Sequence, residues 1–182
     1  MDFVKTVADL DQATELHTVR LLILVDAFAG TDGSESIAGL TKLAKLDFLL
    51  RYPVMLQRAL ESKKKSTRDV HLKKHEQQSV ESEMVRYRFG PWDHRYRSFL
   101  NILMAKGLVT VSIEGRTVMI SLTEAGRENA NLLKSNTDFE PYVRRSQILN
   151  RHFDLTATNL MRFIYDTFPE VVSLRSGERI PT

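Results

Sequence analysis

The chain is 182 residues long, with 42% apolar residues, 27% charged residues and a formal net charge of +3. This size and composition predict one folded domain, at most with a helical extension, and exclude both two large independent units and an intrinsically disordered chain. The sequence has no Cys, which excludes a disulfide framework, a thiolate zinc site, an iron–sulfur cluster and a Cys nucleophile.

The N-terminal segment and the overall charge bear on the location of the protein. Asp2, Asp9 and Asp11 interrupt the first residues, which contain no uninterrupted apolar block. We therefore expect neither a secretory signal nor a membrane span, and we expect a cytoplasmic protein. The sequence pI of about 9.2 is mildly basic, which permits an acidic partner without requiring one.

Helices are predicted through the first third of the chain. Apolar residues recur at helical spacing over residues 15–30, where Gly30 ends the pattern, and again over residues 37–50. Pro53 breaks the second pattern, and a short helix over residues 54–60 is expected to follow it. The first helix is apolar enough to be buried.

A polar insert is predicted at residues 61–83. It contains only three aliphatic residues, so it buries little surface and is expected to be an exposed loop or a mobile helix. Its basic run, Lys63, Lys64 and Lys65, is a candidate for contact with a polyanion. Acidic residues dilute this run, and a solvated flexible loop is the alternative.

The middle of the chain has the signals of a strand, a helix and a β-hairpin. Residues 84–89 alternate apolar and basic side chains, which predicts a short strand closed by a Gly-Pro pair. From residue 92 to residue 106 the amphipathic helical pattern is the clearest in the chain, and it ends at a glycine. Residues 108–122 form two β-rich runs around Gly115, which predicts a hairpin.

More helices are predicted toward the C-terminus. Thr123 is expected to cap a helix that runs to about residue 134. Two further helices are expected near residues 142–153 and over residues 156–168, and the second carries a wide apolar stripe. The tail after Pro169 is expected to be weakly structured.

These elements predict a mainly α fold with a small β-hairpin. Their order in the middle of the chain is that of a winged helix-turn-helix domain, with residues 92–106 as the third helix and residues 108–122 as the wing. We expect this domain over residues 1–134, with the polar insert inside it, and a helical C-terminal extension over residues 135–182.

Signals for catalysis are poor throughout the chain. The glycines form no phosphate-binding loop, no Ser stands in a GxSxG motif, and His71 and His75 have metal-ligand spacing without the rest of a zinc motif. Asp47, Glu61 and Lys63 match the order of a nuclease metal site, but Asp47 lies in a predicted helix where that site needs a strand. We therefore predict a protein that is not an enzyme and that holds no cofactor and no metal.

The predicted third helix and wing carry candidate contact residues for DNA or for a partner protein. Arg95 and Arg97 lie on the helix, and Arg116 lies at the tip of the wing. Proteins that read an operator usually present a denser cluster of cations and amides here. The alternative for Arg95 and Arg97 is that they are solvated or pair with nearby Glu residues.

An aromatic group surrounds the start of this helix. Phe89, Trp92 and Tyr96, together with Arg95, form either a core turn or a partner-binding surface. A core turn would suit the Gly-Pro-Trp sequence, where a strand must bend into a helix. A partner-binding surface would suit the residue types, since aromatic residues and Arg are enriched at protein interfaces.

Two stretches of the sequence resemble a known family. KLAKLDFLLRYP at Lys42–Pro53 and MVRYRFGPWDHRYRSFLNILMAKGLV at Met84–Val109 are similar to the middle component of bacterial three-component ABC-ATPase conflict systems. This group includes the small subunit of Lamassu anti-phage defence. YRFGPWDHRY is the most specific piece, the resemblance covers about residues 15–131, and LMRFIYDTFPE near the C-terminus also looks similar.

The resemblance implies a non-catalytic winged-helix adaptor. Such an adaptor links an SMC- or Rad50-like coiled-coil ATPase to a separate effector, often a nuclease, and DNA is contacted through the complex. The alternative is a free-standing winged-helix transcription regulator, which would dimerise on a short palindromic duplex with strong salt dependence.

Overall fold

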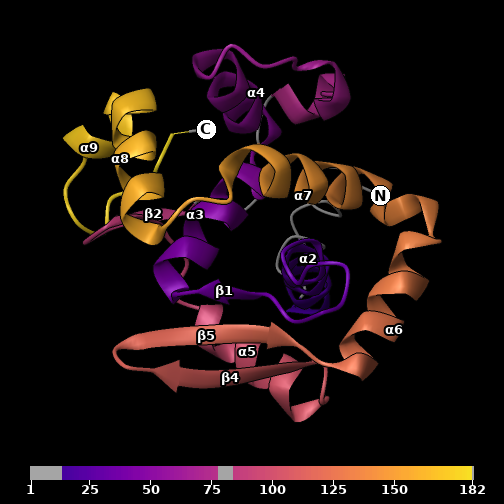
Figure 1. Ribbon diagram of the computed structural model, residues 1–182. Helices are drawn as coiled ribbons and strands as arrows, with labels where there is room; N and C mark the ends of the chain where they lie inside the picture. The colour runs from indigo at the N-terminus through magenta and orange to yellow at the C-terminus, as the bar shows by residue number, and fades with distance from the viewer. Residues whose placement is uncertain (1–13, 78–83, 182) are drawn as a thin grey trace, which may run out of the picture.

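The computed structural model describes residues 14–77 and 84–181 (Figure 1). The α-helices are α2 (Thr14–Ala27), α3 (Leu40–Arg51), α4 (Pro53–Ser62), α5 (Tyr96–Ala105), α6 (Glu124–Lys134), α7 (Glu140–Phe153), α8 (Ala157–Thr167) and α9 (Pro169–Ser173). The strands are β1 (Ser36–Ala38), β2 (Val85–Tyr87), β3 (Gly90–Trp92), β4 (Val109–Glu114) and β5 (Thr117–Leu122). Short 3-10 helices are η1 (Arg68–Val70), η2 (Lys74–Gln77) and η3 (Thr137–Phe139). The predicted fold class, mainly α with a small β-hairpin, is confirmed.

Helix α2 lies at the centre of the core. Its middle is apolar on all sides, as a buried helix requires, and Leu21 through Val25 are each exposed by 3% or less. Helices α5, α6 and α7 pack against it, and Figure 1 shows α2 nearly end-on between α7 and the sheet. Helix α3 packs against α4, α7 and α8. One cluster of buried side chains therefore joins residues on both sides of position 134, and the division into 1–134 and 135–182 stays a prediction.

The larger sheet is antiparallel, with the strand order β1-β5-β4. The predicted hairpin is confirmed, because β4 and β5 pair from Val109 and Leu122 to Glu114 and Thr117. Gly115 occupies the turn with a φ of 61°, a left-handed conformation that favours glycine.

Strand β1 is a departure from the sequence-based expectation. Residues 37 and 38 are predicted as the start of a helix, but they pair with β5, and α3 begins only at Leu40. Gly39, with a φ of 103°, separates the strand from the helix. Because Ile37 fits the inward position of a three-residue strand as well as the first turn of a helix, the apolar pattern does not distinguish the two.

A second hairpin precedes α5. Strands β2 and β3 pair Val85 with Trp92 and Tyr87 with Gly90, so Arg88 and Phe89 form the tip. The predicted strand at residues 84–89 is confirmed in its central part, but the prediction that a helix begins at Trp92 is wrong, since α5 begins at Tyr96.

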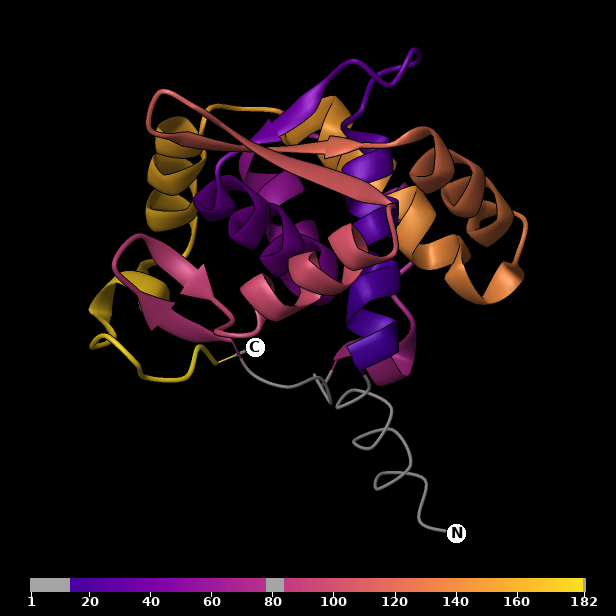
Figure 2. The same ribbon diagram turned by 90° about the horizontal axis from the view of Figure 1, so that it is seen from below.

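The C-terminal tail pairs with the outer edge of β2. The backbone N–H of Arg86 donates to the carbonyl of Glu178 at 2.8 Å, and that of Ile180 donates to the carbonyl of Met84 at 2.9 Å. Ile180 is fully buried, and Figure 2 shows the yellow C-terminal segment beside the hairpin. The expectation of a weakly structured tail after Pro169 is therefore wrong.

Helix α7 anchors the described part of the predicted insert. Nε of Arg145 donates to the carbonyl of Val70 at 3.1 Å, and its two Nη atoms donate to the carboxylate of Glu76 at 2.8 Å each. Val70 is buried, while most of the residues around it are exposed, as predicted. Residues 78–83 of the insert lie outside the described residues.

Helix α6 starts close to the β4–β5 hairpin. The Thr123 hydroxyl accepts a hydrogen bond from the N–H of Gly126 at 2.9 Å, which confirms the predicted cap. A Cβ at position 126 would lie 2.0 Å from the carbonyl oxygen of Leu108, so the close approach requires glycine. The two helices predicted after α6 are present as α7 and α8.

Every helix in the ranges 14–77 and 84–181 is too short or too polar to cross a lipid bilayer.

Candidate partner-binding surface

A buried network of charged side chains joins α2, α3 and the start of α5. Asp47 Oδ1 accepts from Arg20 Nε at 2.7 Å. Its Oδ2 accepts from Arg20 Nη2 at 3.2 Å, from Arg51 Nη2 at 3.1 Å and from the Tyr96 hydroxyl at 2.8 Å. Arg51 also donates to Asp93 Oδ2 from both Nη atoms at 3.1 Å. The network therefore holds three segments that are distant in sequence in one arrangement.

The environment of each acidic group fixes its protonation state. Burial alone would raise the pKa of Asp47, but the charges of the two neighbouring arginines lower that pKa to about 2. Burial likewise opposes ionisation of Asp93, but its bonds to Arg95 and the charge of Arg51 hold its pKa well below the usual range. Burial and the Asp47 carboxylate raise the pKa of the Tyr96 hydroxyl. At neutral pH none of these groups is near its pKa, so the network suits positioning rather than general acid–base catalysis.

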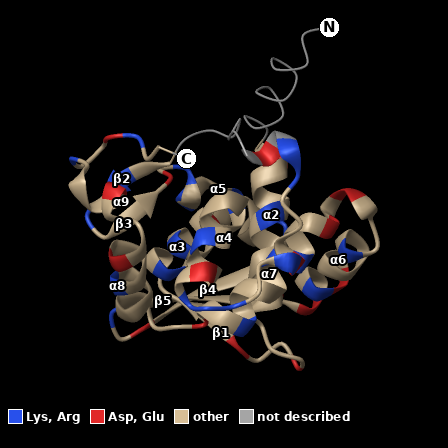
Figure 3. Cartoon of the chain, turned by 90° about the horizontal axis from the view of Figure 1, so that it is seen from above, with Lys and Arg blue, Asp and Glu red and all other residues tan. Residues whose placement is uncertain are grey.

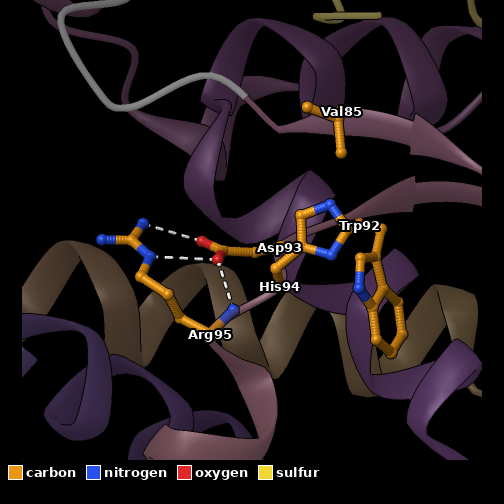
Figure 4. Close-up of a pocket in the computed structure, with 5 residues that line it drawn as sticks. All are labelled: Val85, Trp92, Asp93, His94 and Arg95. Carbon is orange, nitrogen blue, oxygen red and sulfur yellow. Dashed lines mark hydrogen bonds and ion pairs between the residues drawn. The ribbon is translucent and has the colours of Figure 1, made fainter. Parts of the chain in front are cut away.

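Asp93 connects this network to Arg95, and Figure 4 shows the bonds between these two residues. Its Oδ1 accepts from the backbone N–H and from Nε of Arg95, at 2.9 and 3.0 Å, and its Oδ2 accepts from Arg95 Nη2 at 2.8 Å. The Arg95 guanidinium also lies over the ring of Phe99, at 5.3 Å from its centroid. Arg95 is thus paired with an acid, as one alternative expected, but the acid is Asp93 rather than a Glu.

A small pocket opens beside this ion pair. Its volume is about 240 Å³, and it is lined by Val85, Trp92, Asp93, His94 and Arg95. The pocket combines an apolar strand residue, an indole ring, an imidazole ring and the Asp93–Arg95 ion pair. It is large enough for one side chain of a partner protein.

The aromatic candidates divide between the core and the surface. Tyr96 is fully buried, so it belongs to a core turn. Trp92 is half-buried and packs edge-to-face on Tyr96, with their ring centroids 5.4 Å apart. Phe89, at the hairpin tip, is 53% exposed. The two predicted alternatives therefore apply to different residues, and Phe89 is the most exposed of the three aromatic candidates.

Arg97 and Arg116 lie on separate exposed elements. Arg97 is exposed on the first turn of α5, and Arg116 is exposed in the β4–β5 turn. Within the part of the chain that the structure describes, neither has a hydrogen-bond or ion-pair partner. Both are free to bind a partner or a phosphate group.

The three candidate lysines are not equivalent. Lys63 donates from Nζ to the carbonyl of His152 at 2.6 Å, and its ammonium lies over the ring of Phe153, at 4.9 Å from the centroid. It therefore helps to attach the end of α4 to α7. Lys64 and Lys65 are exposed and remain available to a polyanion.

The described residues offer no cluster of three or more His, Asp or Glu side chains suited to a metal ion. His71 ends η1 in a left-handed conformation, with a φ of 48°, and contacts Arg144. Residues 74–77 form the separate turn η2, so the spacing of His71 and His75 does not correspond to one continuous α-helix.

The buried network is the feature that sequence reasoning missed. Arg20 within an apolar helix, and Asp47 with Arg51 one turn later, are signals, because charged residues in buried segments need partners. The partners themselves cannot be deduced from local spacing, since the bonds span 27 residues from Arg20 to Asp47 and 42 residues from Arg51 to Asp93.

Comparison with known proteins places these features in a family context. A family model described as ABC-three component (ABC-3C) system Middle Component 4 matches residues 29–157. The matched range contains both hairpins, α3 to α7, and the network residues Asp47, Arg51 and Asp93. No curated protein and no solved structure matches the chain.

Proposed function

The chain belongs to the family of middle components 4 of ABC-three component systems, and from this membership we propose that it is a non-catalytic adaptor subunit of an ABC-ATPase complex. It links an SMC- or Rad50-like coiled-coil ATPase to an effector such as a nuclease, in an anti-phage defence system similar to Lamassu. It works in the cytoplasm and contacts DNA through the assembled complex. The family match over residues 29–157 is the observation that carries this proposal.

The chemistry around α5 supports contact rather than catalysis. The carboxylates of Asp47 and Asp93 are bound by arginines, so neither is available as a base or a metal ligand. The exposed groups nearby include Phe89 and Arg97, which are residue types common at protein interfaces. An adaptor needs such a surface and no reactive group.

We propose in addition that residues 1–134 form a winged-helix domain and that residues 135–182 form a helical extension. The sheet order β1-β5-β4 and the order α2, β1, α3, α5, β4, β5 support this assignment, with α4 and the β2–β3 hairpin inserted between α3 and α5. In it α5 takes the place of the third helix of a winged helix, and β4–β5 is the wing. Met104 on α5 is 42% exposed and Ile113 on β4 is 74% exposed. Apolar side chains at these positions suit a protein surface better than the phosphates of DNA.

Affinity purification from the native host, with mass spectrometry of the retained proteins, tests the proposed class. An adaptor is retained in fixed stoichiometry with a coiled-coil ATPase and a second component. The alternative, a free-standing transcription regulator, is instead recovered as a dimer that protects a short palindromic duplex. Recovery of the chain with no ATPase, together with such protection, would overturn the adaptor proposal.

A further inference from the structure

The hairpin and the start of α5 expose basic and aromatic side chains together. Tyr87, Arg88 and Phe89 are exposed at the hairpin tip. His94 is exposed in the turn before α5, with its ring centroid 6.0 Å from that of Tyr87, and Arg97 is exposed in the first turn of α5. We call these five residues the hairpin surface. Figure 3 shows basic segments in the loops around β2 and β3.

The hairpin surface has an excess of positive charge. Between residues 84 and 98 the acidic residue is Asp93, which is buried and bound by Arg51 and Arg95. Arg88 and Arg97 have no hydrogen-bond or ion-pair partner among residues 14–77 and 84–181. The surface therefore favours an acidic ligand.

The aromatic rings are arranged for side-chain contacts rather than for stacking of nucleotide bases. Tyr87 is tilted by 31° against Trp92 and lies edge-to-face, at 78°, with His94, with ring centroids 6.0 Å apart in both pairs. Trp92 in turn lies at 73° to Tyr96. Rings in this arrangement cover one another's faces, whereas a single-stranded nucleic acid needs open, successive ring faces and a longer row of cations.

We propose that the hairpin surface binds an acidic peptide segment of a partner component, in which carboxylates flank an apolar side chain. Arg88 and Arg97 pair with the carboxylates, since guanidinium–carboxylate bonds are strong and directional. Phe89 and the pocket beside Trp92 contact the apolar side chain. This inference rests on the proposed adaptor function and adds the chemistry of the partner to it.

Charge reversal in the purified complex tests the proposal. The variant Arg88→Glu with Arg97→Glu should weaken retention of one partner component by about tenfold to hundredfold. The matched control is Arg151→Glu with Arg162→Glu, which changes the charge equally at exposed positions on α7 and α8 and should retain that partner. Thermal melts of both variants should match the wild-type chain.

The identity of the bound segment is tested by photo-crosslinking in the same complex. A benzoyl-phenylalanine at position 89 should cross-link to a segment rich in Asp and Glu, and reversal of those acids to Lys should restore binding of the Arg88→Glu, Arg97→Glu variant. Cross-links to a segment without acids would overturn the proposal. So would binding of a labelled oligo-dT strand that the same double variant abolishes.

The two proposals fail in different ways. A wild-type chain that retains no ATPase contradicts the adaptor function itself. A wild-type complex that forms, and that the Arg88→Glu, Arg97→Glu variant leaves unchanged, contradicts only the assignment of the hairpin surface.

Discussion

Replacing Asp47 with Asn tests how much the buried network contributes to stability. The Asn side chain keeps the size of Asp47 but leaves the fully buried guanidinium groups of Arg20 and Arg51 without the carboxylate that bridges them. Breaking a buried ion pair by removing one partner destabilises a protein by about 3 to 5 kcal/mol. Because one carboxylate serves two arginines here, we expect a loss of about 4 kcal/mol in the free energy of unfolding.

The assay is urea unfolding of the isolated chain, followed by circular dichroism and by the fluorescence of Trp92. Tyr96→Phe provides a graded comparison, because it removes one hydrogen bond to Asp47 and should lower stability by about 1.5 to 3 kcal/mol. Glu128→Gln, at an exposed position on α6, should change stability by less than about 0.5 kcal/mol. A loss below about 1 kcal/mol in the free energy of unfolding of Asp47→Asn would refute the reasoning. It would mean that leaving the buried guanidinium groups of Arg20 and Arg51 without the Asp47 carboxylate costs little stability.

The structure makes further predictions about stability. The pKa of Asp47 falls from 3.8 to about 2 on folding. Its contribution to the free energy of unfolding is therefore complete above about pH 4 and is lost as the pH falls toward 2. Acid titration should destabilise the wild type more steeply than Asp47→Asn. Burial lowers the pKa of Lys45 from 10.5 to about 8, so Lys45→Met should stabilise the protein by about 2 kcal/mol at pH 7. This gain should shrink as the pH rises from about 8 to 10.5, as urea unfolding at pH 7 and at pH 10.5 would show. Gly126→Ala forces a Cβ against the Leu108 carbonyl, so it should lower the free energy of unfolding by about 2 kcal/mol, measured as a lower urea midpoint. An unchanged midpoint would contradict the close approach of Gly126 to the Leu108 carbonyl. Ile180→Ala should lower the free energy of unfolding by about 2 to 3 kcal/mol and should speed hydrogen exchange at the backbone of β2. Unaltered exchange at β2 would show that the C-terminal tail does not stabilise this strand.

Local sequence signals were sufficient for the regular elements of the fold. The amphipathic helix predicted over residues 92–106, the turn at Gly115 and the Thr123 cap each depend on neighbours within a few residues. The turn and the cap are present as predicted, and the helix is present from Tyr96 to Ala105. Strand β1 and the tail around Ile180 depend instead on distant partners, since Ile37 faces Ile120 and Ile180 bonds to Met84. Short segments of this kind are defined by tertiary pairing, which local periodicity does not contain.

The candidate site was predictable by residue type but not by geometry. The sequence identified the aromatic and basic residues around the Gly-Pro pair as either core or surface. The difference between Tyr96, which is buried against Asp47, and Phe89, which is half exposed, depends on where α5 begins. The Asp93 carboxylate accepts the backbone N–H of Arg95 just before that helix, while Phe89 lies at the tip of the β2–β3 hairpin. Neither placement can be read from the residue types alone.

The most direct test of the adaptor function is whether the ATPase retains the effector only when this chain is present. The tagged ATPase and the effector are produced together, with and without this chain, and the proteins held by the ATPase are quantified. The adaptor proposal predicts that the effector is retained with the chain and lost without it. Equal retention of the effector in both samples would contradict the proposal.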